Sequence, residues 1–276
     1  MAVDARRHHG VALKRRHFAD ILERGPRADW FEIVSENFFS AGGRPWSVLE
    51  RIRAERPVSL HGTALGLGNP EGVSEVYLDR LSALVARILP ERVSDHLCFV
   101  GSDGEYSHEL LPLPRTSETV AHVVEQIDRV QTRLERRILV ENPSTYFGYV
   151  EDAMSAAELL AEVAARSGCG ILLDLDNVVV DAHNHGFEPR AFVDALPARQ
   201  VEEYHLAGFT PDGSLLVDTH VGPVPEAVWS LYRHALRTIG PRPTLVEWDT
   251  DTPDLDTVLL ECERARSIER EEEARR

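Results

Sequence analysis

The stretch LLDLDNVVVDAHNHG, residues 172–186, changes character within a few residues. Its start continues an apolar run from Ile171 that suits a buried β-strand. Polar groups follow at once, namely Asp174, Asp176, Asn177, Asp181, His183, Asn184 and His185. This junction is either an ordinary polar loop or a strand whose end carries metal ligands. One stretch does not separate these interpretations, so the pattern has to be sought elsewhere in the chain.

Short apolar runs recur along the chain and predict eight strands. They cover residues 30–34, 57–60, 91–99, 137–141, 170–175, 201–206, 214–218 and 243–248. Stretches of helical length with apolar residues three and four apart lie between them, at 74–89, 117–134, 155–168 and 225–240. This alternation indicates an α/β fold with a parallel sheet, and at 276 residues its closed form is a single (β/α)8 TIM-type barrel. An open doubly wound sheet is the alternative, but no Gly-rich dinucleotide fingerprint follows the first predicted strand.

The predicted barrel domain spans residues 1–266, and residues 267–276 form a charged C-terminal tail. Ser117 and Ser155 are predicted helix N-caps, and Gly168 and Gly240 are predicted C-caps.

The predicted strands end in acids and histidines. These residues are Glu36 with Asn37, His61, His96, Glu141, Asp174, His205, Asp218 with His220, and Glu247. In a barrel all of these ends gather at the C-terminal mouth. Lys and Arg are almost absent from the ends, so the carboxylates lack partners, at a cost of roughly several kcal/mol each when buried. One strand-end histidine is commonly structural, but bound cations account for the whole set.

The donor set contains imidazoles and carboxylates but no cysteine. Such a set suits iron, manganese or zinc and disfavours a thiolate cluster or a calcium site. The number of donors exceeds the need of one ion, which favours two or three metals bridged by a carboxylate. The three cysteines, Cys98, Cys169 and Cys262, have no paired spacing and are predicted to be small buried side chains.

Composition excludes several other classes of protein. A net charge of −16 repels a phosphate backbone and argues against nucleic-acid binding. No apolar run approaches the roughly 18–20 residues of a membrane span. The basic N-terminus lacks the apolar segment of a signal peptide, so we expect a cytoplasmic protein.

Several motifs together resemble one known family. They are SLHGTALGLGNP (59–70), SDHLCF (94–99), ILVENPSTY (138–146), GCGILLDLDNVVVDAHNHG (168–186), HLAGF (205–209), DTHVGPV (218–224) and LVEWDTDTP (245–253). In this order they resemble the multinuclear non-heme iron-dependent oxidative enzymes, the family that includes the methanobactin-biosynthesis oxidase. The resemblance implies a xylose-isomerase-like barrel with two or three irons, mixed Fe(II)/Fe(III), at its mouth. It also implies O2 as co-substrate, oxidation of a cysteine or a C-terminal residue in a ribosomally made precursor peptide, and a separate leader-binding partner in a heterodimer.

The resemblance also assigns metal ligands. For a central pair of irons it implies His61, His96, Glu141, Asp174, His205 and Glu247, with Glu141 as the bridge. For a third ion it implies Asn177, Asp218 and His220. Glu141, Asp174 and Glu247 are the expected catalytic residues, and His183, Asp176, Glu36 and Asn37 are weaker candidates. Asp176 stands where the family commonly has Asn, so it adds negative charge near the site.

Three other functions remain open. Sugar isomerases and abasic-site endonucleases also use His, Asp and Glu at barrel strand ends, and a non-catalytic metal-binding subunit is a further alternative. The charge argues against an endonuclease. An isomerase usually needs a lysine near the metals, whereas the only lysine, Lys14, is predicted to lie in the first helix. The sequence does not select the peptide, the product, the metal or the oligomeric state.

Overall fold

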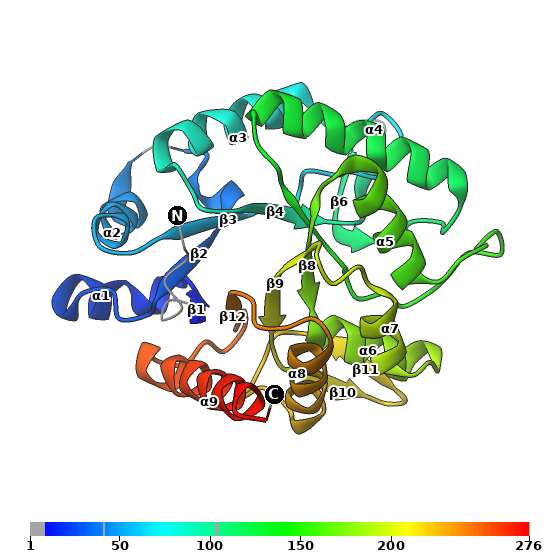
Figure 1. Cartoon of the computed structure of the whole chain (residues 1–276). Coiled ribbons are helices and arrows are strands. Elements are labelled where there is room, and N and C mark those ends of the chain that lie inside the picture. Colours follow the sequence, from blue (N-terminus) through cyan, green and yellow to red (C-terminus); the bar gives the residue numbers. More distant parts are fainter. Residues whose placement is uncertain (1–8, 41, 103–104, 276) are drawn as a thin grey trace.

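The computed structural model describes residues 9–40, 42–102 and 105–275, and these form a closed barrel of eight parallel strands (Figure 1). The strands neighbour one another in the order β1-β12-β9-β8-β7-β4-β3-β2. Their bounds are β1 His9–Ala12, β2 Trp30–Val34, β3 Val58–His61, β4 Val93–His96, β7 Leu139–Glu141, β8 Gly170–Asp174, β9 Val201–Leu206 and β12 Thr244–Val246. The prediction of a (β/α)8 barrel is confirmed.

Helices surround the strands (Figure 1). They are α1 Phe18–Arg24, α2 Gly43–Arg53, α3 Glu75–Ile88, α4 Ser117–Leu134, α5 Ala156–Ser167, α6 Leu175–His185, α7 Pro189–Ala195, α8 Glu226–Thr238 and α9 Leu255–Glu273, with short 3-10 turns η1 Arg15–His17 and η2 Ser35–Phe38. Each of the long helices turns one apolar face to the sheet, as Val120, Val123 and Ile127 of α4 do. Cys98, Cys169 and Cys262 are free and buried, as predicted.

One predicted barrel strand is wrong. Residues 214–218 contain β11, Leu215–Asp218, which pairs only with β10, Phe209–Asp212, in a partly exposed antiparallel hairpin. The eighth barrel strand is instead β1, which lies between β12 and β2. The run HGVA is short and adjoins basic residues on both sides, so its own pattern does not indicate a buried strand.

Two hairpins follow strand ends at the mouth. Besides β10–β11 after β9, the hairpin of β5, Phe99–Ser102, and β6, Glu105–Leu111, follows β4. The predicted strand 91–99 is therefore divided between β4 and the start of β5. Because loops after the strands of a (β/α)8 barrel form its C-terminal face, both hairpins belong to the rim of the mouth.

The helix caps agree with the sequence in part. Ser155 forms a capping box with Glu158 of α5, and Gly168 ends that helix with φ 70°. The N-cap of α4 is Thr116 and not Ser117, which is the first helical residue. Ile239 caps α8, so the predicted cap Gly240, with φ 109°, lies one residue beyond it.

Replacing Ser155 by alanine is expected to lower the free energy of unfolding by about 1 kcal/mol, because it removes the hydroxyl that accepts the N-cap hydrogen bond from Glu158 N. Urea unfolding measures this difference. Ser117→Ala is the matched control, because its hydroxyl bonds only to the exposed carboxylate of Glu118. Equal losses in the two variants would contradict the assignment of the cap.

The C-terminal segment differs from the expected tail. Helix α9 packs against β1 and continues to Glu273, so the expected boundary at residue 266 lies inside it. Ile268 and Glu272 are buried, and Arg237 of α8 donates two hydrogen bonds to Glu272, of 2.5 and 2.7 Å. Apolar residues at helical spacing continue the buried face of α9 past residue 266, although charge dominates the composition there. Among the described residues no helix is long and apolar enough to cross a bilayer.

Candidate metal centre

Six predicted ligands meet at the mouth of the barrel. Each lies within one residue of the end of a strand, and none is more than 7% exposed. They are His61, His96, Glu141, Asp174, His205 and Glu247. The sheet register places His96 opposite Glu141 and Asp174 opposite His205. The parallel sheet therefore joins side chains that are up to 186 residues apart in the chain, since His61 and Glu247 are its outermost members.

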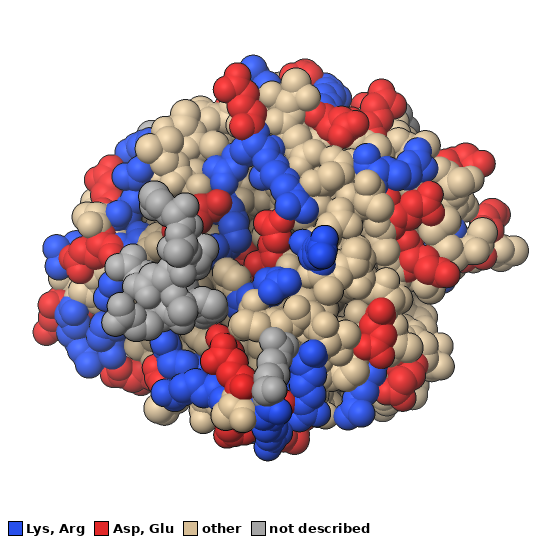
Figure 2. All heavy atoms as spheres, in the orientation of Figure 1, with Lys and Arg blue, Asp and Glu red and all other residues tan. Residues whose placement is uncertain are grey.

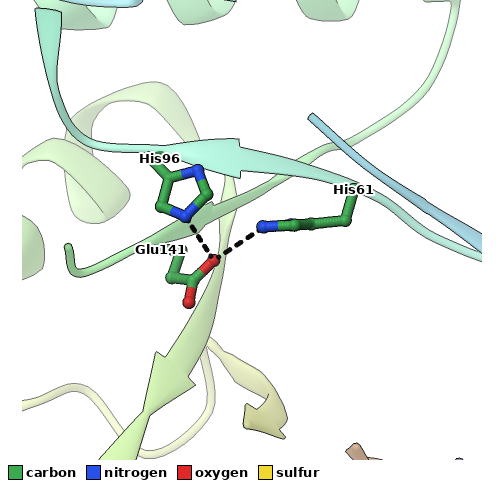
Figure 3. Close-up of side chains that lie close together, drawn as sticks. All are labelled: His61, His96 and Glu141. Atoms are coloured by element: carbon green, nitrogen blue, oxygen red, sulfur yellow. Dashed lines mark ion pairs between the residues drawn. The ribbon is translucent and has the colours of Figure 1, made fainter. Parts of the chain in front are cut away.

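The first cluster consists of His61, His96 and Glu141 (Figure 3). The Nε2 atoms of His61 and His96 lie 3.2 and 3.3 Å from Glu141 Oε2. The two rings meet edge to face with their centroids 4.6 Å apart. Three donors thus converge on one point from three adjacent strands.

The hydrogen-bond partners of the outer ring nitrogens determine the tautomers of these two histidines. His96 Nδ1 lies 3.0 Å from the carbonyl oxygen of Gly62, which only accepts. His61 Nδ1 lies 2.8 Å from Ser94 Oγ, whose own hydroxyl donates to Leu60 O at 3.3 Å. Both Nδ1 atoms therefore carry the proton, and both Nε2 lone pairs face Glu141. This is the arrangement of metal-binding histidines with an outer hydrogen-bond partner.

Burial keeps both imidazoles neutral. It is the main cause that lowers the pKa of His96 to about 4 and that of His61 well below 6.5, and the neighbouring histidines lower the latter further. Neutral imidazole is the form that binds metal.

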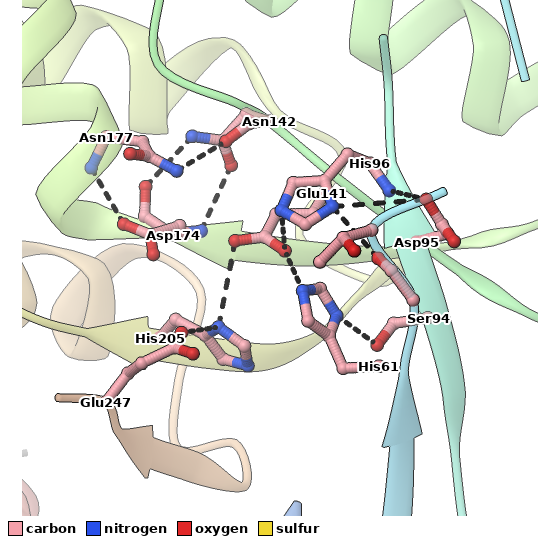
Figure 4. Close-up of polar contacts among 12 residues, drawn as sticks. His61, Ser94, Asp95, His96, Glu141, Asn142, Asp174, Asn177, His205 and Glu247 are labelled. Carbon is pink, nitrogen blue, oxygen red and sulfur yellow. Dashed lines mark hydrogen bonds and ion pairs between the residues drawn. The ribbon is translucent and has the colours of Figure 1, made fainter. Parts of the chain in front are cut away.

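The second cluster consists of Glu141, Asp174 and His205. His205 Nδ1 lies 3.7 Å from Glu141 Oε1 and 3.4 Å from Glu247 Oε2. Glu141 thus turns Oε2 to the first cluster and Oε1 to the second, as Figure 4 shows. Burial raises the pKa of Glu141 well above 4.5 and that of Asp174 to about 6, because the desolvation of these carboxylates outweighs the opposing effect of nearby histidines, of which His205 acts on both.

A third set of donors adjoins the second. Asp174, His220 and Glu247 form one group, and Asp176, Asp218 and His220 form another. His220 Nε2 lies 2.7 Å from Asp218 Oδ1, and His220 Nδ1 lies 3.5 Å from Glu247 Oε2. Asp218 and His220 reach the mouth from the β10–β11 hairpin and the residues after it, not from a barrel strand. His220 has φ 46°, a left-handed conformation that costs energy and is common at functional sites.

Asp174 is held by its backbone and by the start of α6. Its Oδ1 accepts a hydrogen bond from Asn177 N at 2.7 Å as the N-cap of that helix. Asn142 binds both backbone groups of Asp174, at 3.0 and 2.9 Å, and its own carbonyl accepts from Asn177 Nδ2 (Figure 4). These bonds leave Asp174 Oδ2 and Asn177 Oδ1 free for another partner.

The residues present fit a metal centre. Several buried polar atoms at the mouth have no hydrogen-bond partner, among them Glu141 Oε2, Asp174 Oδ2, both carboxylate oxygens of Asp176 and Asn177 Oδ1. Unpartnered buried polar groups are costly. Nitrogen and oxygen donors of this kind suit iron, manganese or zinc, and cations would satisfy them.

Other predicted site residues lie outside these clusters. Glu36 Oε1 accepts from the backbone N–H groups of Thr63 and Ala64, each at 2.9 Å, and from Tyr77 Oη at 2.5 Å, so it holds the loop after β3. Asn37 is exposed in η2. His183 is exposed and lies 3.0 Å from Ser214 O on the β10–β11 turn.

The position of Lys14 corrects the sequence interpretation. It follows β1 at the mouth and is not part of a helix. Its ammonium group bonds to Asp249 and lies 3.8 Å from Glu247 Oε1. Burial by itself lowers the pKa of Lys14, but Glu247 and Asp249 outweigh it and raise the pKa above 10.5. The strand-end carboxylates therefore do have one cationic neighbour, and the absence of a nearby lysine no longer argues against an isomerase.

Sequence reasoning also missed Glu32, Glu203 and Asn142. Glu32 and Glu203 lie inside strands β2 and β9 and form a buried group with His205. An acid within an otherwise apolar strand, as in WFEIV, is the signal that would have found Glu32. Asn142 binds only backbone groups of Asp174 and a side chain of α6, which no sequence pattern reveals.

Replacing Ser94 by alanine is expected to weaken metal binding at the first cluster about 10- to 100-fold, because it removes the acceptor that orients His61. Competition with a coloured chelator measures the affinity. Ser59→Ala is the matched control, since Ser59 is equally buried on β3 but its hydroxyl has no hydrogen-bond partner. An unchanged affinity in Ser94→Ala would contradict the role of this serine.

A parallel barrel with these clusters at its C-terminal mouth defines a TIM barrel with residues that could hold metal ions where such barrels carry their active sites. The chain belongs to the family described as "RiPP precursor modification enzyme MbnB/TglH/ChrH", whose profile matches residues 8–270. Membership makes the chain an enzyme of a family that modifies ribosomally made precursor peptides.

The chain is also similar to individual proteins, in sequence to its relatives and in fold to solved structures. A UPF0276 protein of Anaeromyxobacter sp. (strain Fw109-5) is 48% identical over 261 residues, which cover 95% of this chain and 92% of the relative. A UPF0276 protein of Caulobacter vibrioides is 44% identical over 259 residues, with coverage of 94% and 92%. D-Psicose 3-epimerase from Clostridium cellulolyticum H10 has a TM-score of 0.61 at 11% identity, with coverage of 95% and 98%. A xylose isomerase-like TIM barrel protein from Mycobacterium smegmatis has a TM-score of 0.56 at 14% identity, with coverage of 92% and 86%. At these identities the two structures show the fold alone.

Proposed function

We propose that this enzyme holds two or three iron ions and uses O2 to oxidise one residue of a precursor peptide, a cysteine or else a C-terminal residue. A separate partner protein binds the leader of that peptide. The observation that carries the proposal is the sharing of donors. Glu141 belongs to the first and second clusters, Asp174 to the second and third, and His220 to both groups of the third.

The shared carboxylates support a multinuclear centre over separate ions. Bridging by Glu141 would hold two cations close together, while neutral His61 and His96 complete the first site. Asp218, His220 and Asn177 would hold a third ion through Asp174. When bound, iron supplies the one-electron and O2 chemistry that side chains lack. The protein residues position the ions and, because the donors are buried, exclude water from them.

The rim of the mouth supports a peptide as the substrate. Tyr146 and Phe147, in the loop after β7, are each 46% exposed, and Val150 in the same loop is fully exposed. Tyr106 on β6 and Leu215 on β11 are each 43% exposed. Tyr146 Oη accepts a hydrogen bond of 2.9 Å from Asp218 N, so this rim is connected directly to the third donor set. Exposed apolar side chains at a functional mouth are typical of surfaces that bind a peptide or a protein partner.

Charge favours this proposal over an endonuclease. On the face in Figure 2 acidic and basic side chains are interspersed. The whole chain has a net charge of −16. A DNA-binding enzyme needs an extended basic surface. The family match favours peptide modification over sugar isomerisation.

The first test is metal content and Mössbauer spectroscopy of protein purified without oxygen from iron-supplemented cells. We expect two or three irons per chain. Addition of the cognate precursor peptide and its partner should then cause O2 consumption and a mass change in the peptide. Stoichiometric zinc or manganese that iron does not replace, without O2 uptake, would overturn the proposal. Iron binding without turnover on the peptide would identify a non-catalytic subunit.

A further inference from the structure

A group of polar side chains lies inside the barrel beneath the metal-binding clusters. It contains Glu32 of β2, Glu203 of β9 and His205, and each is at most 3% exposed. His205 Nε2 lies 3.3 Å from Glu32 Oε1 and 3.8 Å from Glu203 Oε1. The other ring nitrogen, Nδ1, faces Glu141 and Glu247. His205 therefore separates an upper set of carboxylates from a lower set.

The lower set has a cation of its own. Arg92, which directly precedes β4, donates from Nε to Glu203 Oε2 at 2.6 Å, and its guanidinium lies over the ring of Trp30 at 4.4 Å. A metal ion among Glu32, Glu203 and His205 would be repelled by this fixed positive charge and would find one oxygen of Glu203 already bound. The upper carboxylates have no such arginine near them among the ion pairs of the described residues. The lower set thus differs in charge from the clusters that are proposed to hold metal.

The three central histidines differ in which nitrogen points outward. His61 and His96 use Nδ1 for their outer hydrogen bonds, to Ser94 and to Gly62 O. His205 is reversed, and the acceptor next to its outer nitrogen Nε2 is the carboxylate of Glu32. A carboxylate that accepts the outer N–H of a histidine fixes the tautomer and ring orientation of a metal ligand.

We propose that Glu32 is a positioning residue, which accepts the Nε2–H of His205 and so presents Nδ1 to the metal shared with Glu141 and Asp174. Arg92 and Glu203 form their own ion pair below this contact. The inference rests on the proposed function in one respect, that His205 binds a metal ion, and it does not depend on which metal this is.

The test uses the zinc-loaded, ¹⁵N-histidine-labelled protein, since zinc is diamagnetic. We expect the His205 ring to show a protonated Nε2 and a metal-bound Nδ1, whereas His61 and His96 show the opposite pattern. This measurement on the wild-type chain needs no variant to fold. Coordination of His205 through Nε2 would overturn the inference.

Variants of Glu32 add a second readout. Glu32→Leu removes the acceptor at similar size and should weaken zinc binding at the second cluster about 10- to 100-fold. Glu32→Gln keeps an acceptor oxygen without charge, so it should keep the tautomer and lose less affinity. Asp181→Asn is the control, because Asp181 is another buried acid, which bonds Thr145 and not a predicted ligand.

The outcomes separate this inference from the proposed function. Unchanged zinc affinity in both Glu32 variants would overturn the role of Glu32 and leave the oxidative function standing. A wild-type protein with the expected tautomers but no iron-dependent O2 consumption would overturn the oxidative function and leave Glu32 as the positioning residue.

Discussion

Replacing Glu141 by glutamine is expected to lower the rate of turnover about a thousandfold or more, because the variant loses metal that stabilises the transition state. A loss of this size corresponds to roughly 4 kcal/mol. Glu141 faces His61 and His96 with one oxygen and His205 with the other, so its loss affects two sites together. The metal content should fall by at least one ion per chain. Peptide turnover by mass spectrometry and metal analysis of the same preparation measure the two effects.

Without bound metal, the Glu141→Gln variant should be folded as stably as the wild-type protein. Burial raises the pKa of Glu141, so its charged form opposes folding when no cation is bound, and an amide of the same shape removes that opposition. Asp181→Asn is the matched control, since it makes the same change at a buried site that holds the loop at Thr145. Full metal content and turnover in Glu141→Gln would contradict a bridging role.

Removal of metal is expected to lower the melting temperature by roughly 10 °C. Ligand at about 1,000 times its Kd stabilises the native state by about 4 kcal/mol, and each kcal/mol shifts a domain of this size by about 2–4 °C. The physical cause is the set of buried acids at the mouth, including Asp174 and Asp176, which lack hydrogen-bond partners for some of their oxygens. Calorimetry with and without chelator measures the difference.

Two comparisons make this result specific. Magnesium should not restore the melting temperature lost to chelation, because imidazole donors suit iron or zinc and not magnesium. Glu141→Gln should show a smaller shift than the wild type, since it holds less metal. If chelator leaves the wild-type melting temperature unchanged, the clusters do not bind metal in the purified protein.

Most strands of the barrel were predictable because the residues of each strand by themselves have the apolar pattern of a buried strand. The run GILL of β8 is apolar up to Asp174, as strands covered on both faces are, and the capped helix α6 follows it. The exception is β1, where four residues carry too little pattern and only pairing with β12 and β2 makes the strand. The prediction of a barrel strand at 214–218 was wrong for the opposite reason. The local pattern does suit a strand, but that strand pairs with β10 and not with a strand of the barrel.

The sequence by itself determined the ligand types, their order and their place at strand ends, since strand periodicity and the closed barrel carry such residues to one mouth. Tertiary structure alone decided how the ligands divide into clusters, since that depends on register and side-chain direction. It alone placed Lys14 beside Glu247, and Glu32 behind His205. These contacts join residues 233 and 173 positions apart, as their numbers show, and no local pattern encodes a contact at that separation. Only the closure of the barrel brings them together.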